Sequence, residues 1–208
     1  MRSVFSLIAV LSISLSSTAQ EGDWEIAKPP KEAGKAPQVE LKGDKIVLID
    51  RGMIRTKKQF KRGSTTECTW KYVGGQDKGS YQDVLSIITR THGKQREKRS
   101  HEIENGVMIQ FAAHAQTISI QRFSSKKVSS NLIARIPAKI ERGKEHKILI
   151  HDQIFEDKGG LVAIHFDGRL VLEAAVNLLD EDGDYVAVYN RERGPASQIS
   201  ILSGLSIK

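Results

Sequence analysis

The segment DEDGD at residues 180–184 gathers four carboxylates, which could bind calcium or act in acid–base catalysis. An EF-hand loop that starts at Asp180 would need Gly at its sixth position and Glu at its twelfth. Gly183 is the fourth residue and Arg191 the twelfth, so that motif is excluded. A looser calcium site at the edge of a sheet stays open as one alternative. The other is a solvated turn that leads Tyr185 into a strand.

A second candidate for carboxylate chemistry is the pair Glu102 and Glu104, which strand alternation places on one face. Retaining glycosidases use two carboxyl groups about 5 Å apart, and this spacing allows such a distance. Asn105-Gly106 follows at once and indicates a turn, which sets the pair at the end of its strand. We predict no catalytic residue, with this pair as the alternative.

Sugar recognition requires an aromatic plate for the C–H face of the ring and planar polar groups for its hydroxyls. Segments near the ends of three predicted strands offer such side chains. The predicted carbohydrate-binding residues are Trp70, Tyr72, Arg90, His92, His101 and Glu102. The alternative for the first two is that Trp70 belongs to the core and Tyr72 is partly exposed.

The remaining reactive side chains show no catalytic or metal-binding pattern. Cys68 is the one cysteine, so no intramolecular disulfide can form, and its alternation with Trp70 predicts an inward-facing apolar role. The sequence has no nucleophile elbow, phosphate loop or zinc-protease motif. His146 and His151, five residues apart in a strand, should point to opposite faces. We predict no cofactor, with calcium as the exception left open above.

The chain carries a formal net charge of +7, which comes mainly from the basic runs RTKKQFKR (residues 55–62) and RTHGKQREKR (residues 90–99). Such runs can bind acidic glycans or acidic proteins. They can also be solvated loops or edge strands that prevent aggregation. Aromatic residues do not alternate with the basic ones, so we predict no nucleic-acid partner.

The first 19 residues have the pattern of a signal peptide: Arg2, an apolar run, then small residues up to Ala19. The run is too short for a membrane span. We therefore predict export to the periplasm, cell surface or extracellular space after cleavage near Ala19. Residues 20–38, rich in Pro, Gly and Lys, should be a flexible linker, and residues 39–208 a single domain.

From Val39 onward the hydrophobic pattern has a period of two residues and is interrupted by Gly-, Asp- or Asn-containing turns. The predicted strands are residues 45–50, 65–73, 83–91, 105–113, 116–123, 131–136, 145–155, 160–166, 169–174, 184–190 and 198–208. Asp167-Gly168 should form a two-residue hairpin turn with Phe166 opposite Arg169 and Ile164 opposite Val171. Eleven short strands predict an all-β antiparallel jelly-roll sandwich.

Three segments carry a family resemblance: GMIRTKKQFKRGSTTECTWKYV, GKEHKILIHDQIFEDKGGLVAIHFDGRLVLEA and DYVAVYNRERGPASQISILSGLSIK. They resemble the concanavalin A-like lectin and glucanase superfamily, in particular bacterial laminin-G-like and 3-keto-disaccharide hydrolase-like domains. The resemblance spans residues 51–208 and implies a jelly-roll fold. The Glu-x-Asp-x-x-Glu motif of the glucanases is absent, as is the tryptophan-containing opening of the hydrolases.

These observations favour a secreted, carbohydrate-binding domain without catalysis, whose partner is an oligosaccharide or polysaccharide. One alternative is a glycoside hydrolase-like enzyme that acts on keto-sugars or oligosaccharides. Another is a laminin-G-like protein-interaction domain that uses its basic loops.

Overall fold

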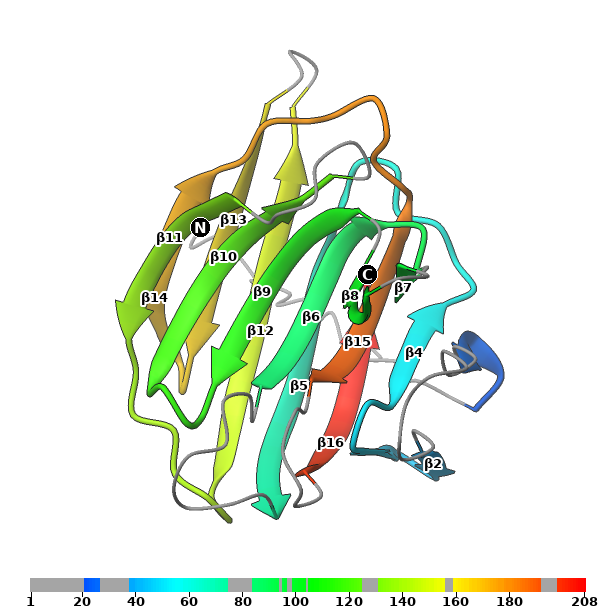
Figure 1. Cartoon of the computed structure of the whole chain (residues 1–208), viewed down its shortest axis with the longest axis vertical. Helices are drawn as coiled ribbons and strands as arrows, with labels where there is room; N and C mark the ends of the chain where they lie inside the picture. Colours follow the sequence, from blue (N-terminus) through cyan, green and yellow to red (C-terminus); the bar gives the residue numbers. More distant parts are fainter. Residues whose placement is uncertain are drawn as a thin grey trace, which may run out of the picture.

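The computed structural model describes residues 21–26, 38–74, 84–93, 95–96, 99–103, 105–124, 131–155, 159–191 and 198–208. Apart from a single 3-10 turn at Glu21–Asp23, the regular structure of these residues consists of β-strands. Two antiparallel seven-stranded sheets pack face to face as the predicted jelly-roll sandwich (Figure 1).

Sheet A is the layer nearer the viewer in Figure 1. Its spatial order is β1 (Trp24–Ile26), β4 (Met53–Thr56), β15 (Tyr185–Arg191), β6 (Val84–Thr91), β9 (Gly106–Ala112), β10 (Thr117–Phe123) and β11 (Asn131–Pro137). Sheet B runs β14 (Arg169–Ala175), β13 (Gly160–Phe166), β12 (Glu145–Ile154), β5 (Gly63–Gly74), β16 (Gln198–Ile207), β3 (Lys45–Ile49) and β2 (Gln38–Lys42). A separate ribbon pairs β7 (Gln95–Arg96) with β8 (Arg99–Ile103).

All eleven predicted strands are present, each with ends within two residues of the prediction. The predicted signal peptide lies outside the described residues. Within the predicted linker, the structure differs at Trp24–Ile26, which forms β1 and pairs with β4. The physical reason is burial: Trp24 retains 5% of its surface exposed and packs against the main core. An aromatic side chain of this size stabilises a strand that the surrounding Pro and Gly do not favour.

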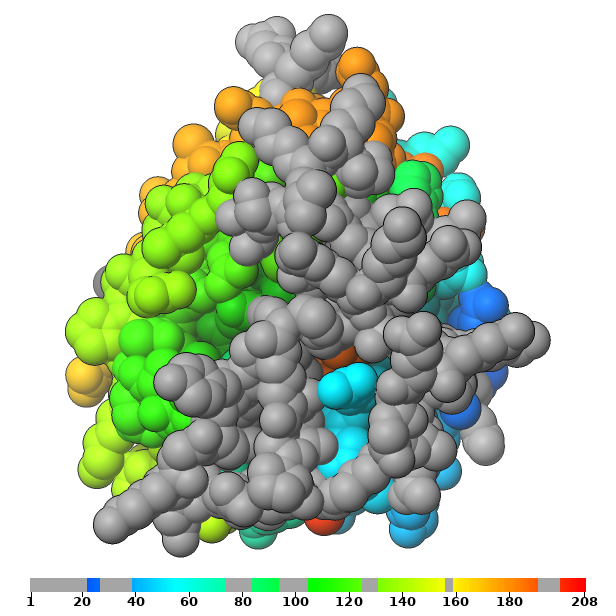
Figure 2. All heavy atoms as spheres, in the orientation of Figure 1, coloured from blue at the N-terminus to red at the C-terminus, as the bar shows by residue number. Residues whose placement is uncertain are grey.

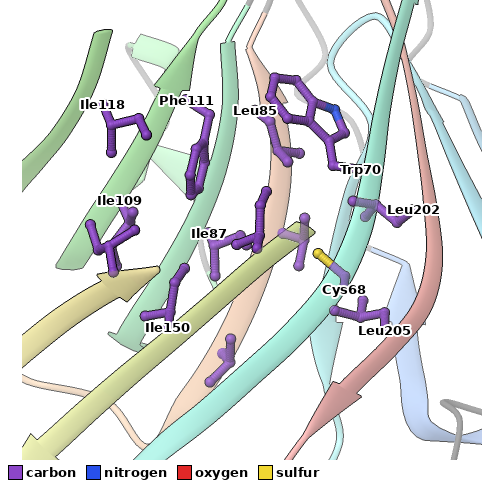
Figure 3. Close-up of a cluster of buried hydrophobic side chains, with 14 of the residues drawn as sticks. Cys68, Trp70, Leu85, Ile87, Ile109, Phe111, Ile118, Ile150, Leu202 and Leu205 are labelled. Carbon is purple, nitrogen blue, oxygen red and sulfur yellow. The ribbon is translucent and has the colours of Figure 1, made fainter. Parts of the chain in front are cut away.

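The main core lies between the two sheets, because alternate residues of each strand point inward. Sheet A contributes Leu85, Ile109 and Phe111, which face Trp70 and Cys68 of sheet B (Figure 3). Burial raises the pKa of the Cys68 thiol to about 12, with the charge of Glu67 adding to the effect. The predicted inward, apolar role of Cys68 is confirmed.

Two β-bulges change which side chains face the core. In the β13–β14 hairpin, Phe166 lies opposite Arg169 as predicted, but a register shift after Ile164 places that residue opposite Leu172 instead of Val171. In β16, a shift between Ser203 and Ser206 separates two halves of the strand. Such an extra residue reverses the alternation on one side of the bulge, which a period-two pattern cannot anticipate.

A buried chain of hydrogen bonds links the two sheets through Ser200 of β16. The Trp70 indole N–H donates to Ser200 Oγ at 3.1 Å, and Ser200 Oγ donates to Asn190 Oδ1 at 2.8 Å. Asn190 Nδ2 donates to the Leu48 carbonyl oxygen at 3.2 Å. Each donor therefore has an acceptor, which removes the cost of burying these groups.

Candidate functional site

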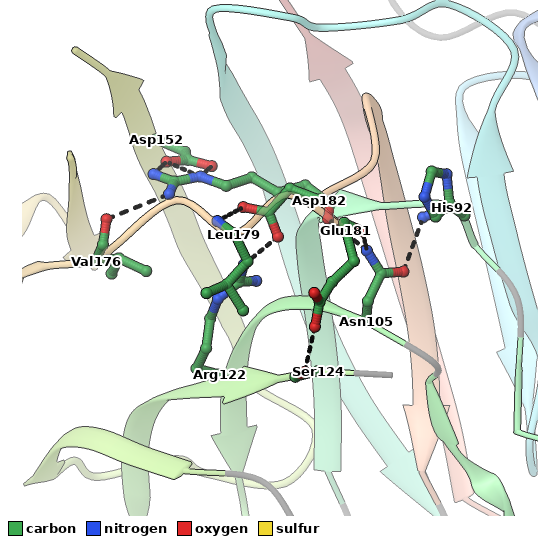
Figure 4. Close-up of polar contacts among 10 residues, drawn as sticks. His92, Asn105, Arg122, Ser124, Asp152, Val176, Leu179, Glu181 and Asp182 are labelled. Atoms are coloured by element: carbon green, nitrogen blue, oxygen red, sulfur yellow. Dashed lines mark hydrogen bonds and ion pairs between the residues drawn. The ribbon is translucent and has the colours of Figure 1, made fainter. Parts of the chain in front are cut away.

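The acidic segment 180–184 crosses the top of the sandwich between β14 and β15 (orange in Figures 1 and 2) and is held by side chains of sheet A (Figure 4). Asp182 forms an ion pair with Arg122 and accepts a hydrogen bond from the Leu179 N–H at 3.1 Å. The side chains of Arg122 and Asp182 are 9% and 11% exposed. The predicted turn that leads Tyr185 into a strand is confirmed, since a turn at residues 180–181 precedes β15. Asp180 is exposed as expected, but Glu181 and Asp182 are half-buried because polar and cationic groups bind them.

Further polar contacts fix the same loop. Ser124 donates to the Glu181 carboxylate, and Asn105 Nδ2 donates to the Glu181 carbonyl oxygen. The Gly183 N–H donates to the Arg90 carbonyl oxygen at 3.0 Å. A side chain at position 183 would collide with the Thr91 backbone, which explains the glycine. The loop is therefore part of the rigid framework.

This arrangement bears on the calcium alternative. Asp182 is already neutralised by Arg122, and Glu181 accepts from Ser124. Among the described residues, no group of three or more His, Cys, Asp or Glu side chains could hold a metal ion. The Arg122 guanidinium therefore occupies the position at which the Asp182 carboxylate would face a cation.

Arg90 lies in the interior and joins the two sheets. Its guanidinium binds the Asp152 carboxylate of β12, with Nε 3.0 and 3.2 Å from the two oxygens. Both side chains are almost fully buried, at 2% and 1% exposure. Arg90 has a positive φ of 54°, and the β6–β15 register shifts between Tyr185 and Ala187 beside it. This bulge turns the side chain toward sheet B.

His146, at the opposite end of β12, is also buried and fully hydrogen-bonded. Its Nδ1 lies 2.9 Å from an Asp167 oxygen, and its Nε2 accepts the Glu141 N–H at 3.2 Å. The ring stacks on Phe166 with centroids 4.8 Å apart. His151 is partly exposed and contacts Thr65, so the predicted opposite orientation of these two histidines is confirmed. Together these contacts define a structural role for His146.

Partial burial alone would raise the pKa of Asp167. Hydrogen bonds from His146 and from the Lys147 N–H outweigh this effect and hold the pKa below its ordinary value. Asp167 has a positive φ of 51° in the hairpin turn, a conformation that Asp tolerates. The turn and the buried histidine therefore stabilise one another.

The outer face of sheet A, turned away from the core, carries two rows of side chains that run across six strands. Direct pairing partners define the first row as Met53, Tyr189, Ser86, Gln110, Ser119 and Arg135. They define the second row as Arg55, Ala187, Ile88, Met108, Gln121 and Leu132. With about 4.8 Å between neighbouring strands, each row is about 24 Å long.

The rows combine planar polar groups with apolar side chains, and most of them are buried: Met53, Ile88, Met108 and Tyr189 are at most 1% exposed. Gln121 Nε2 donates to Gln110 Oε1 and contacts Ser119 Oγ at 3.4 Å, so the three form one polar group. Beside it, Met53, Ile88, Met108, Phe123, Ala187 and Tyr189 make a second apolar cluster, separate from the main core. None of the twelve row residues is an Asp or Glu. This surface could bind sugar hydroxyls but holds no pair of carboxylates for hydrolysis.

The structure does not bring the six predicted carbohydrate-binding residues onto one surface. Trp70 and Tyr72 share a face as predicted, but this face is the interior of the sandwich, with 0% and 3% exposure. Arg90 is committed to Asp152. His92 is exposed next to the end of β6. The side chains of the last two, His101 and Glu102 of β8, lie outside the described part of the chain, as does Glu104.

A groove of about 470 Å³ lies on the outer face of sheet B. Glu67, Lys147, Leu149, His165 and Ser203 are among its lining residues. Its described lining includes no Trp, Tyr or Phe, so it lacks the flat apolar plate that a sugar ring prefers. The outer face of sheet A is the stronger candidate for a glycan.

No protein-family model matches the chain, and no curated protein matches it in sequence. Solved structures do match its fold. A carbohydrate-binding module from Bacillus subtilis has a TM-score of 0.58 and 13% identity, covering 89% of this chain and 95% of that one. A legume lectin-like domain from Entamoeba histolytica has a TM-score of 0.60 and 12% identity, covering 98% and 99%. A Bacillus licheniformis β-glucanase has a TM-score of 0.55 and 11% identity, covering 92% and 94%.

These three structures are similar to this chain over most of their own length, so the likeness concerns the whole sandwich and not a local motif. At these identities it establishes the fold and leaves activity open. In the part of the chain that the structure describes, no helix is long and apolar enough to cross a membrane.

Proposed function

We propose that this chain, which has the concanavalin A-like jelly-roll fold, binds an oligosaccharide or polysaccharide along the two rows of sheet A and performs no catalysis there. The observation that carries the proposal is the composition of the rows, which join amide and hydroxyl groups to aromatic and thioether side chains without a carboxylate. Gln110 and Gln121 can each donate and accept, as a pair of sugar hydroxyls requires. Tyr189 supplies an aromatic ring in the first row.

The names of two similar structures support the same class of ligand, since one is a carbohydrate-binding module and another a lectin-like domain. The third is a glucanase. The two rows of this chain contain no carboxylate, which argues against hydrolysis at this face. The carbohydrate-binding residues predicted from sequence have no part in this proposal, except that exposed His92 could contact a glycan that extends beyond β6.

Ser86 and Tyr189 are fully buried and Gln121 is 9% exposed, so the proposal requires this face to become exposed when a glycan binds. The proposed function includes export of the chain, with cleavage of the signal peptide near Ala19. Expression of the full-length sequence in a secreting host should yield a protein that starts at Gln20. Retention inside the cell, with Met1 intact, would contradict this part.

The binding test is a glycan array followed by calorimetric titration of the exported protein. Gln121→Ala should weaken the best ligand about 3- to 10-fold, the size of one or two lost hydrogen bonds. Gln153→Ala, an exposed glutamine on the outer face of sheet B, is the matched control and should leave affinity unchanged. Equal effects of the two variants, or release of reducing sugar from the ligand, would refute the proposal.

A further inference from the structure

A second cavity lies where the edge of sheet A meets the end of β16. Its volume is about 430 Å³. Its walls come from residues 22–24, from residues 56–58 and Phe60, and from Ser206 and Ile207. At this edge β1 pairs with β4, and Figure 1 shows the blue segment that begins at residue 21 beside β4. The cavity is outside the two rows and contains none of the six predicted carbohydrate-binding residues. Its Lys57 and Lys58 belong to the basic run of residues 55–62, for which an acidic glycan was one expected partner.

The cavity has apolar walls. Trp24 and Ile207 line it from β1 and β16, and the half-buried Phe60 lines it from the loop after β4. Trp24 is 5% exposed, and its buried indole N–H has no hydrogen-bond partner. A buried donor without an acceptor costs about 1–3 kcal/mol, so a small movement that gave it an acceptor would be favourable.

The rim of the cavity is cationic. Lys57 and Lys58 are exposed and line the opening, and the Lys58 ammonium lies 5.3 Å from the centre of the Phe60 ring. Exposed Lys61 and Arg62 follow in the chain. Asp23 is the acidic residue among the described lining, so positive charge dominates.

The loop that carries these side chains is held in place by hydrogen bonds. The Lys57 N–H donates to the Asp23 carbonyl oxygen at 3.0 Å. The Phe60 N–H donates to the Asp184 carbonyl oxygen at 2.6 Å. Thr56 Oγ1 donates to the Lys58 carbonyl oxygen at 3.0 Å. The backbone that carries the lysines and the aromatic wall is therefore pre-organised, which lowers the entropy lost when a ligand binds.

We propose that this cavity binds one acidic sugar residue, a ring that carries a carboxylate or a sulfate. The apolar faces of Phe60 and Ile207 match the C–H face of the ring, and the two lysines match its anion. The volume is within the range of small-ligand sites. The inference rests on the proposed glycan-binding function and adds a preference for acidic glycans at a second site.

The test compares methyl glucuronide and glucose 6-sulfate with neutral methyl glucoside, titrated into the exported protein and followed by tryptophan fluorescence, to which Trp24 and Trp70 both contribute. We expect each acidic sugar to bind at least 10-fold more tightly than the neutral one, with the difference falling as salt is added. Lys58→Gln combined with Lys57→Gln should abolish the preference. Lys45→Gln, an exposed lysine of β3, is the control and should retain it.

Equal affinity for the acidic and neutral sugars, no binding of any of them, or an unchanged preference in the double lysine variant would overturn the inference. The two proposals fail in different ways. If the lysine variants alter acidic-sugar binding but Gln121→Ala leaves array ligands unaffected, only the sheet A proposal fails. If Gln121→Ala weakens array ligands and the lysine variants do nothing, only the acidic-sugar site fails.

Discussion

Removing the Asp152 carboxylate should be among the most destabilising single changes in this fold. Asp152→Ala leaves the Arg90 guanidinium with 2% exposure and without its counter-ion. Breaking a buried pair in this way costs about 3–5 kcal/mol. For a chain of this size the loss corresponds to a fall of about 6–20 °C in Tm. Urea denaturation followed by Trp fluorescence would measure the free energy of unfolding directly.

The control is an ion pair that lies on the surface of the protein. Lys42 and Glu40 lie 2.6 Å apart, but their side chains are 70% and 42% exposed. Glu40→Ala should change the free energy of unfolding by less than about 0.5 kcal/mol. The double variant Arg90→Ala/Asp152→Ala should lose less than the sum of the two single changes. A loss below about 1 kcal/mol for Asp152→Ala would refute the buried bridge between the sheets.

Three further outcomes test other parts of the structure. Ser200→Ala removes the acceptor of the Trp70 indole N–H and the donor to Asn190 Oδ1, so the free energy of unfolding should fall by about 1–3 kcal/mol. A neutral result in urea denaturation would contradict the buried polar chain. Cys68, with its pKa raised to about 12, should not react with a thiol reagent at pH 8 until the protein unfolds, and rapid labelling of the native chain would contradict its burial. Because the folded pKa of Asp167 is depressed below its ordinary 3.8, its contribution is present above that value and is lost as pH falls through the folded pKa. Asp167→Asn should therefore flatten the stability profile below about pH 4 in acid titrations of wild type and variant, and parallel profiles would contradict this coupling.

The strands could be predicted from sequence because a period-two pattern is local and repeats in nearly every segment. The bulges could not, since one additional residue reverses the alternation without a change in composition. Arg90 illustrates the consequence. The sequence predicts it as a carbohydrate-binding residue at the end of a strand, but the bulge in the β6–β15 pair directs its side chain into the interior. One signal was available, because Asp152 falls on the inward face of β12 with Ile148 and Ile150 and implies a buried counter-ion.

The two rows were beyond sequence analysis for a different reason. Gln110 and Gln121 lie on strands adjacent in the chain, but Tyr189 and Ser86 meet only because β15 inserts between β4 and β6. That order depends on long-range pairing. The composition of the individual strands contains no information about which side chains become neighbours.

The most direct test of carbohydrate binding on sheet A is a heteronuclear NMR titration of the exported protein with its best array glycan. The predicted result is that the amide side chains of Gln110 and Gln121 shift together and saturate with the affinity found by calorimetry. Saturable shifts at the groove around Glu67 and His165, with Gln110 and Gln121 unmoved, would contradict the account.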